Sequence, residues 1–203
     1  MANPDFTYRP RTGPVIAVAV WALAAWALIT LAATDPTKLV VFLPAAGCAA
    51  LTVWAVFWAP KVVVAQGAIT VRNVLTTHHI PWSAITRIDT KWALTLYTGQ
   101  RKIAAFAAPA PSSLHAVKAP SRRDLAHLPA TTFDAARSVR PGDLPGTPSG
   151  DLAWVVRERW QEICDSMPTG PTSGHTASWR LHTPLLVAWA ALAALTILGM
   201  YIL

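Results

Sequence analysis

Charged residues are scarce in this sequence and are absent from three long stretches. The stretches 15–33, 39–59 and 185–203 are apolar, and each is close to the roughly 20 residues that an α-helix needs to cross a bilayer. The first is apolar on every side, which argues against an amphipathic helix on the membrane surface. The sequence therefore predicts a multi-pass protein of the cell membrane, with two membrane helices before and one after a polar segment at 61–183.

Cysteine is rarer still, and side chains that could perform chemistry do not cluster. The two cysteines, Cys48 and Cys164, form no ligand set. His78 and His79 are adjacent in a predicted strand, where neighbouring side chains point to opposite faces, so a shared metal ion is disfavoured. No phosphate loop, nucleophile elbow or paired-carboxylate motif is present. We therefore expect no enzymatic activity: no catalytic residue, no metal site and no cofactor.

Acidic residues are outnumbered by basic ones, ten to 17, which gives a formal charge of +7. Nucleic-acid binding would need clustered basic residues with exposed aromatic rings, and adjacent pairs occur only at 101–102 and 122–123, so we expect no nucleic-acid partner. A basic surplus is instead expected beside an anionic membrane leaflet. The expected lipid-surface contacts are Lys61, Arg72, Arg87, Lys91, Arg101 and Lys102.

The positions of lysine and arginine predict the orientation in the membrane. Arg9 and Arg11 precede the first apolar stretch, and Lys61 and Arg72 follow the second without an acidic residue before Asp89. Positive residues near membrane helices stay in the cytoplasm. The N-terminus and the polar segment are therefore expected to be cytoplasmic. A cleaved signal peptide is the alternative for the first stretch, but that stretch exceeds the usual 7–15 apolar residues, and cleavage would leave the polar segment on the same side.

Alternation of apolar and polar residues predicts a series of antiparallel strands directly after the second membrane helix. Gln66-Gly67 is a turn signal between the first two strands, and Thr98-Gly99-Gln100 separates the last two. The predicted strands cover 62–65, 69–71, 77–80, 85–90, 92–97 and 102–107.

The rest of the polar segment is predicted to contain a single helix. Seven prolines make regular structure scarce in an insert at 108–150, and a loop of this length tends to be either functional or disordered. Apolar residues at helical spacing then predict an amphipathic helix from Asp151 to Met167 with Ser149 as its N-cap. Residues 169–183 are rich in Gly, Pro, Ser and Thr and are expected to be a flexible linker.

The strand sequence VVVAQGAITVRNVLTTHHIPWSAITRIDTKWALTLYTGQRKIAAFAAP resembles the bacterial pleckstrin-homology (PH) domains of actinobacterial membrane proteins, in particular the low-molecular-weight protein antigen 6 family. The most specific part is Ile80-Pro81-Trp82 followed by Ile85 and Ile88. The resemblance implies an α+β protein with a PH-like split β-barrel of six or seven antiparallel strands, capped by a C-terminal helix. The expected structural core is Trp82, Ile85, Ile88, Leu94, Leu96 and Trp160.

Together these patterns divide the chain into five parts. They are a cytoplasmic tail at 1–13, a membrane hairpin at 14–60, the PH-like domain at 61–168, the linker at 169–183 and the last membrane helix at 184–203. The expected function is a non-catalytic, membrane-anchored adaptor or scaffold that presents a cytoplasmic protein-binding surface to an unknown partner. The alternatives are an accessory subunit of a larger membrane or envelope complex, or an anionic-lipid sensor. The turn Ala65–Ala68 has no cation, so we expect lipid attraction without headgroup specificity.

Overall fold

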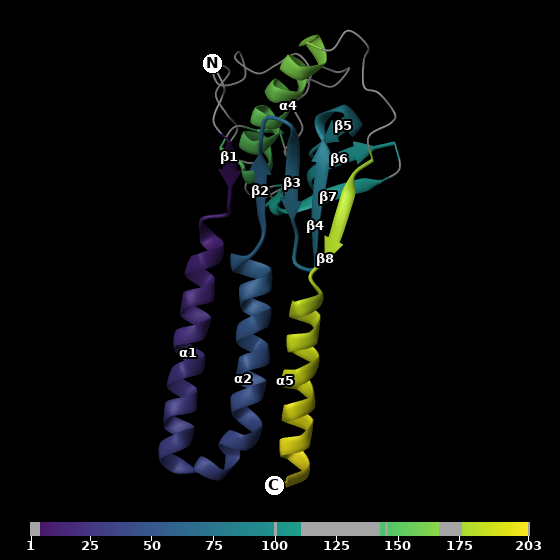
Figure 1. Cartoon of the computed structure of the whole chain (residues 1–203). Coiled ribbons are helices and arrows are strands. Elements are labelled where there is room, and N and C mark those ends of the chain that lie inside the picture. Colours follow the sequence, from purple (N-terminus) through teal and green to yellow (C-terminus); the bar gives the residue numbers. More distant parts are fainter. Residues whose placement is uncertain (1–4, 100, 111–142, 145, 167–175, 203) are drawn as a thin grey trace. The chain divides into compact units, whose positions relative to one another are not determined.

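The computed structural model of the chain describes residues 5–99, 101–110, 143–144, 146–166 and 176–202 (Figure 1). Within these residues the fold is α+β, with two antiparallel sheets and three helices that are long and apolar enough to cross a membrane. Two of those helices come before residue 61 and one begins at residue 183, as predicted. Most of the proline-rich insert at 108–150 lies outside the described residues.

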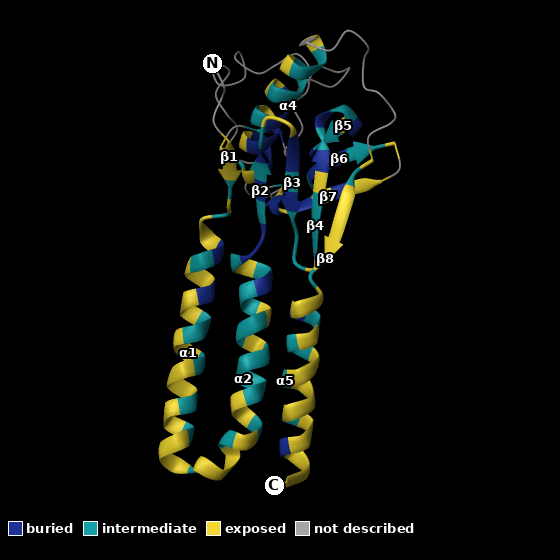
Figure 2. Cartoon of the chain, in the orientation of Figure 1, coloured by how far each residue is buried: buried dark blue, intermediate teal, exposed yellow. Residues whose placement is uncertain are grey.

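The membrane-spanning candidates are α1 (Thr12–Thr34), α2 (Leu39–Val53) with short helical turns at both ends, and α5 (Thr183–Ile202). The turns are Pro36–Lys38 before α2 and the π-helix Trp54–Trp58 after it. Only 6–11% of the most apolar window of each candidate is buried within the protein, and Figure 2 shows α1 and α5 largely exposed. Exposed apolar side chains along whole helices are what a lipid environment requires.

Helix α2 packs against both α1 and α5. Gly13 lies against the backbone of Phe57, and a Cβ at Gly199 would come within 2.9 Å of the Val40 carbonyl oxygen. Close packing of helices at small residues is typical of membrane proteins. The indole N–H of Trp21 donates to the Ala50 carbonyl (3.1 Å), so this deep tryptophan is a helix contact.

Eight strands are present in the described residues, two more than the six predicted. The five-stranded sheet has the order β1-β2-β3-β4-β8 and the three-stranded sheet the order β5-β6-β7. The strands are β1 (Phe6–Tyr8), β2 (Lys61–Val64), β3 (Ala68–Arg72), β4 (Thr76–Pro81), β5 (Ile85–Asp89), β6 (Ala93–Thr98), β7 (Lys102–Pro109) and β8 (Ser178–Leu181).

The two additional strands come from segments for which no strand was predicted. β1 lies in the N-terminal tail and pairs with β2, with Tyr8 opposite Val62. β8 lies in the predicted flexible linker and joins the sheet beside β4. The linker prediction is therefore wrong for Ser178–Leu181. Strands of three or four residues form because the neighbouring strand supplies hydrogen-bond partners, and their own sequences carry little signal.

The core is formed by buried residues of β2 to β7, by Trp82 between β4 and β5, and by the helix at Pro148–Ser166. Ile85, Leu94 and Leu96 are fully buried, and Trp82 is 2% exposed. Ile88 and Trp160 are partly buried and pack against this cluster. In Figure 2 the buried residues gather in the strands, in contrast to the candidate membrane helices.

Asn73 links the two sheets in a way that strand periodicity does not reveal. Its side-chain amide donates to the Ala104 carbonyl (2.8 Å) and accepts from the Phe106 backbone N–H (2.9 Å). The amide therefore bonds the β7 backbone as another strand would, beside the end of β3. This pair of hydrogen bonds helps to close the split barrel.

The capping helix α4 runs from Pro148 to Ser166 and begins three residues earlier than predicted. Its N-cap is Thr147, whose hydroxyl oxygen accepts the Gly150 backbone N–H (3.0 Å), and not Ser149. Pro148 then takes the first helical position, which needs no N–H donor. Met167, the predicted last residue, lies outside the described residues.

Candidate functional site

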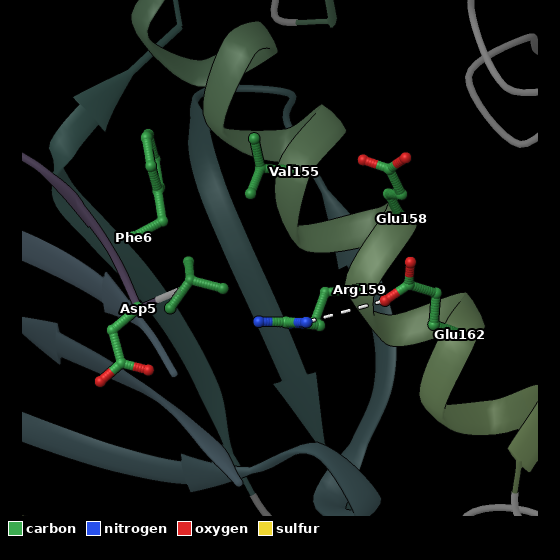
Figure 3. A pocket seen from close by; sticks show the side chains of 7 residues that line it. Asp5, Phe6, Val155, Glu158, Arg159 and Glu162 are labelled. Atoms are coloured by element: carbon green, nitrogen blue, oxygen red, sulfur yellow. Dashed lines mark ion pairs between the residues drawn. The ribbon is translucent and has the colours of Figure 1, made fainter. Parts of the chain in front are cut away.

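A groove of about 260 Å³ lies between the edge of the five-stranded sheet and α4 (Figure 3). It is lined by Asp5, Phe6, Val64, Val155, Glu158, Arg159 and Glu162. β1 supplies Phe6, which is 41% exposed, and β2 supplies Val64, which is buried. The groove therefore combines an apolar floor with ionised side chains, in a place where the sheet ends.

Helix α4 contributes the charged side of the groove. Glu158 and Arg159 are each three or four residues from both Val155 and Glu162, so the four side chains lie on one side of the helix. Figure 3 shows Arg159 reaching from α4 toward the strand side, where Phe6 and Asp5 lie. Arg159 Nη1 is 3.8 Å from Glu162 Oε2.

The predicted lipid contacts form separate groups in the structure. Lys61 and Arg72 are opposite each other on β2 and β3. On the other sheet, Tyr97 is opposite both Arg87 of β5 and Lys102 of β7. The Arg87 guanidinium carbon is 4.0 Å from the Tyr97 ring centroid, and Lys102 Nζ is 5.7 Å from it. Two cations and an aromatic ring thus share one face of the three-stranded sheet.

The remaining two predicted lipid contacts also lie beside aromatic rings. The Arg101 guanidinium carbon is 5.4 Å from the Trp179 ring centroid on β8. Lys91 Nζ is 5.8 Å from the ring of Trp92, which is 78% exposed. Each such cation–π contact at an exposed site is worth roughly 0.5–1 kcal/mol.

The two adjacent histidines point to opposite faces of β4. His79 is opposite Thr70, and its Nδ1 lies 3.1 Å from the Thr70 hydroxyl. His78 is opposite the buried Val71, and burial, followed by the nearby positive charge of Arg101, lowers the pKa of its imidazole. The described residues contain no group of three His, Cys, Asp or Glu side chains that could hold a metal ion.

A buried polar network that sequence reasoning did not find lies beneath α4. Asp143 Oδ1 accepts a hydrogen bond from the Thr90 hydroxyl (2.7 Å) and lies 2.7 Å from Nη1 of Arg157. All three residues are buried. The network joins α4, the end of β5 and the end of the proline-rich insert, so its evident role is structural.

Sequence reasoning also missed the residues that line the groove. One available signal was composition, because Glu158 and Glu162 are the only glutamates of the chain and are four residues apart in the predicted helix. Asp5 and Phe6 carried no such signal. They lie 55 or more residues from the rest of the lining, and only the pairing of β1 with β2 brings them to the groove.

The comparison with known families agrees with this fold. Residues 59–142 match the family model described as Bacterial PH domain. This segment is a bacterial PH domain. The match runs through residues 108–142, which were predicted to belong to an insert, while α4, β1 and β8 lie outside it. No curated protein and no solved structure gives a significant match to the chain.

Proposed function

We propose that this chain is a non-catalytic, membrane-anchored adaptor whose PH domain presents a protein-binding surface. The observation that carries the proposal is the groove between β1, β2 and α4. A sheet edge beside an apolar groove can accept an extended peptide, since the backbone supplies hydrogen bonds and the groove receives side chains. Three helices suited to cross a membrane supply the anchor.

The connections between the PH domain and the candidate membrane helices are short. Three residues separate Tyr8 from α1, two separate Trp58 from β2, and one separates Leu181 from α5. Each residue extends at most about 3.6 Å, so these short connections tether the domain, and any partner bound to it, to the candidate membrane helices. We propose that this happens on the cytoplasmic side, as Arg9, Arg11 and Lys61 indicate.

A matched pair of variants tests whether the groove binds a partner. Phe6→Arg puts a long charged side chain into the groove, and Phe106→Arg makes the same change at another exposed phenylalanine, 52% exposed, on β7. Full-length proteins in mild detergent are compared by affinity purification, and each retained protein is then tested in purified form. A direct partner should bind the wild type and Phe106→Arg but not Phe6→Arg. Equal binding to all three proteins would count against the groove.

Anionic-lipid attraction is a second candidate function, which the row of Arg87, Tyr97 and Lys102 favours. These side chains are exposed or half-exposed, so screening should weaken their attraction to lipid as the Debye length falls from about 10 Å at 0.1 M salt to about 3 Å at 1 M. The full chain in neutral nanodiscs should bind phosphatidylglycerol or cardiolipin vesicles weakly, and this binding should disappear as the salt concentration is raised. Binding to one lipid that resists high salt would instead indicate a specific sensor.

A further inference from the structure

The groove is negatively charged in a chain that is positively charged overall. Its lining holds three carboxylates, from Asp5, Glu158 and Glu162, and one guanidinium, from Arg159, so three negative charges and one positive charge give −2. The whole chain has a formal charge of +7. Three of its ten acidic residues, including both glutamates, thus line one groove. This concentration favours a cationic ligand and disfavours lipid phosphates and nucleic acid.

The single guanidinium does not neutralise the groove. Arg159 and Glu162 are 3.8 Å apart, and 57% of the Glu162 side chain is exposed. An ion pair of this length and exposure contributes only about 0.2–1 kcal/mol. Glu158 and Asp5 are also exposed. All three carboxylates can therefore be reached by a cation from outside the chain.

The apolar part of the groove selects for a second kind of side chain. Phe6, Val64 and Val155 form this part, and the volume of about 260 Å³ is below the roughly 300–1,000 Å³ of pockets that enclose a drug-sized molecule. One or two side chains fit better than a cofactor. β1 stands at one end of the strand order in the described residues, so its outer backbone groups can pair with an extended segment.

We infer that the groove binds an extended peptide segment of a partner protein in which an apolar side chain stands next to lysine or arginine. The apolar side chain packs on Phe6 and Val155, and the cation is attracted to the carboxylates that line the groove, those of Asp5, Glu158 and Glu162. This inference rests on the proposed adaptor function and names the chemistry of its partner.

Three labelled peptides of equal length test the inference by fluorescence anisotropy with the full chain in detergent. In each peptide leucine alternates with one polar residue, which is lysine in the first, glutamine in the second and glutamate in the third. The lysine peptide should bind roughly tenfold more tightly than the glutamine peptide, and the glutamate peptide should bind least. Glu158→Gln or Glu162→Gln should each weaken lysine-peptide binding by about threefold, the effect of one partly exposed ion pair. Asp165→Asn removes a charge from the same helix outside the groove lining and should have no effect.

The same measurements separate failure of this inference from failure of the proposed function. If the glutamine peptide binds as tightly as the lysine peptide and Phe6→Arg still abolishes binding, the groove binds peptides but the charge selection is wrong. If Phe6→Arg changes the binding of no peptide, both proposals fail. A dimer of the purified protein that Glu158→Gln dissociates would identify a second copy of the chain as the occupant, and would overturn the inference.

Discussion

At the scale of single residues, Trp82 fixes the corner where β4 passes into β5. It is 2% exposed, and its indole N–H donates to the Ala65 carbonyl (2.9 Å) in the first hairpin turn. Trp82→Ala should cost the PH domain roughly 3–5 kcal/mol, the range for deleting a buried large aromatic side chain. Hydrogen exchange of β2–β7 amides in the full chain measures this loss. Trp92→Ala, at an exposed tryptophan, is the control, and a loss below about 1 kcal/mol for Trp82→Ala would contradict the core assignment.

Asp143 illustrates how a buried charge depends on its partner. Asp143→Ala leaves the Arg157 guanidinium, whose side chain is 10% exposed, without its carboxylate. Removing one partner of a buried pair costs about 3–5 kcal/mol, whereas replacing both by apolar residues is often neutral. The double variant Asp143→Leu, Arg157→Met should therefore be more stable than Asp143→Ala by the same exchange measurement. If the double variant is less stable than Asp143→Ala, the ion pair itself stabilises the fold more than apolar residues at the same positions do.

At the scale of elements, α4 shows that a cap decides where a helix begins. Thr147→Ala removes the acceptor for the Gly150 N–H and should cost about 0.5–2 kcal/mol. Thr147→Ser keeps a hydroxyl and should retain most of the stability. Hydrogen exchange of the amides in the first turn of α4 measures the difference in stability. Unchanged exchange rates in Thr147→Ala would show that Thr147 is not the N-cap residue.

The short strands β1 and β8 show the limit of element prediction from sequence. The six strands between residues 61 and 109 are short apolar or alternating segments with turn residues between them, so their pattern predicts them with shifts of only a few residues at their ends. Ser178–Leu181 is exposed along its whole length, so no buried alternation marks it. Its place beside β4 depends on pairing between segments that are far apart in the chain.

At the scale of the whole molecule, the five-stranded sheet contains the strands that adjoin all three candidate membrane helices. β1 precedes α1 and β2 follows α2, yet the two strands pair residue by residue, which requires both to lie on one side of the membrane. β8, just before α5, belongs to the same sheet.

Reporter fusions test which side carries the PH domain. We expect a reporter that works only in the cytoplasm to be active at the N-terminus and at position 140, and inactive at the C-terminus, because of the positive charges of Arg9, Arg11, Lys61 and Arg72. Activity of an extracytoplasmic reporter at position 140 would reverse the orientation. The N-terminus and position 140 should give the same result with either reporter. A reporter that is active at only one of these two positions would contradict the β1–β2 pairing.

The sequence by itself determined the features that depend on local patterns. Long apolar stretches specify membrane helices because the bilayer excludes charge along about 20 residues, and alternation specifies strands because one face is buried. Only the tertiary structure decided which distant residues meet. Asp5 and Phe6 line the same groove as Glu158 and Glu162 because β1 pairs with β2 beside α4. Asn73 bonds the β7 backbone because the two sheets are brought together in the fold. Such contacts follow from packing and strand pairing across the fold, which no local pattern encodes.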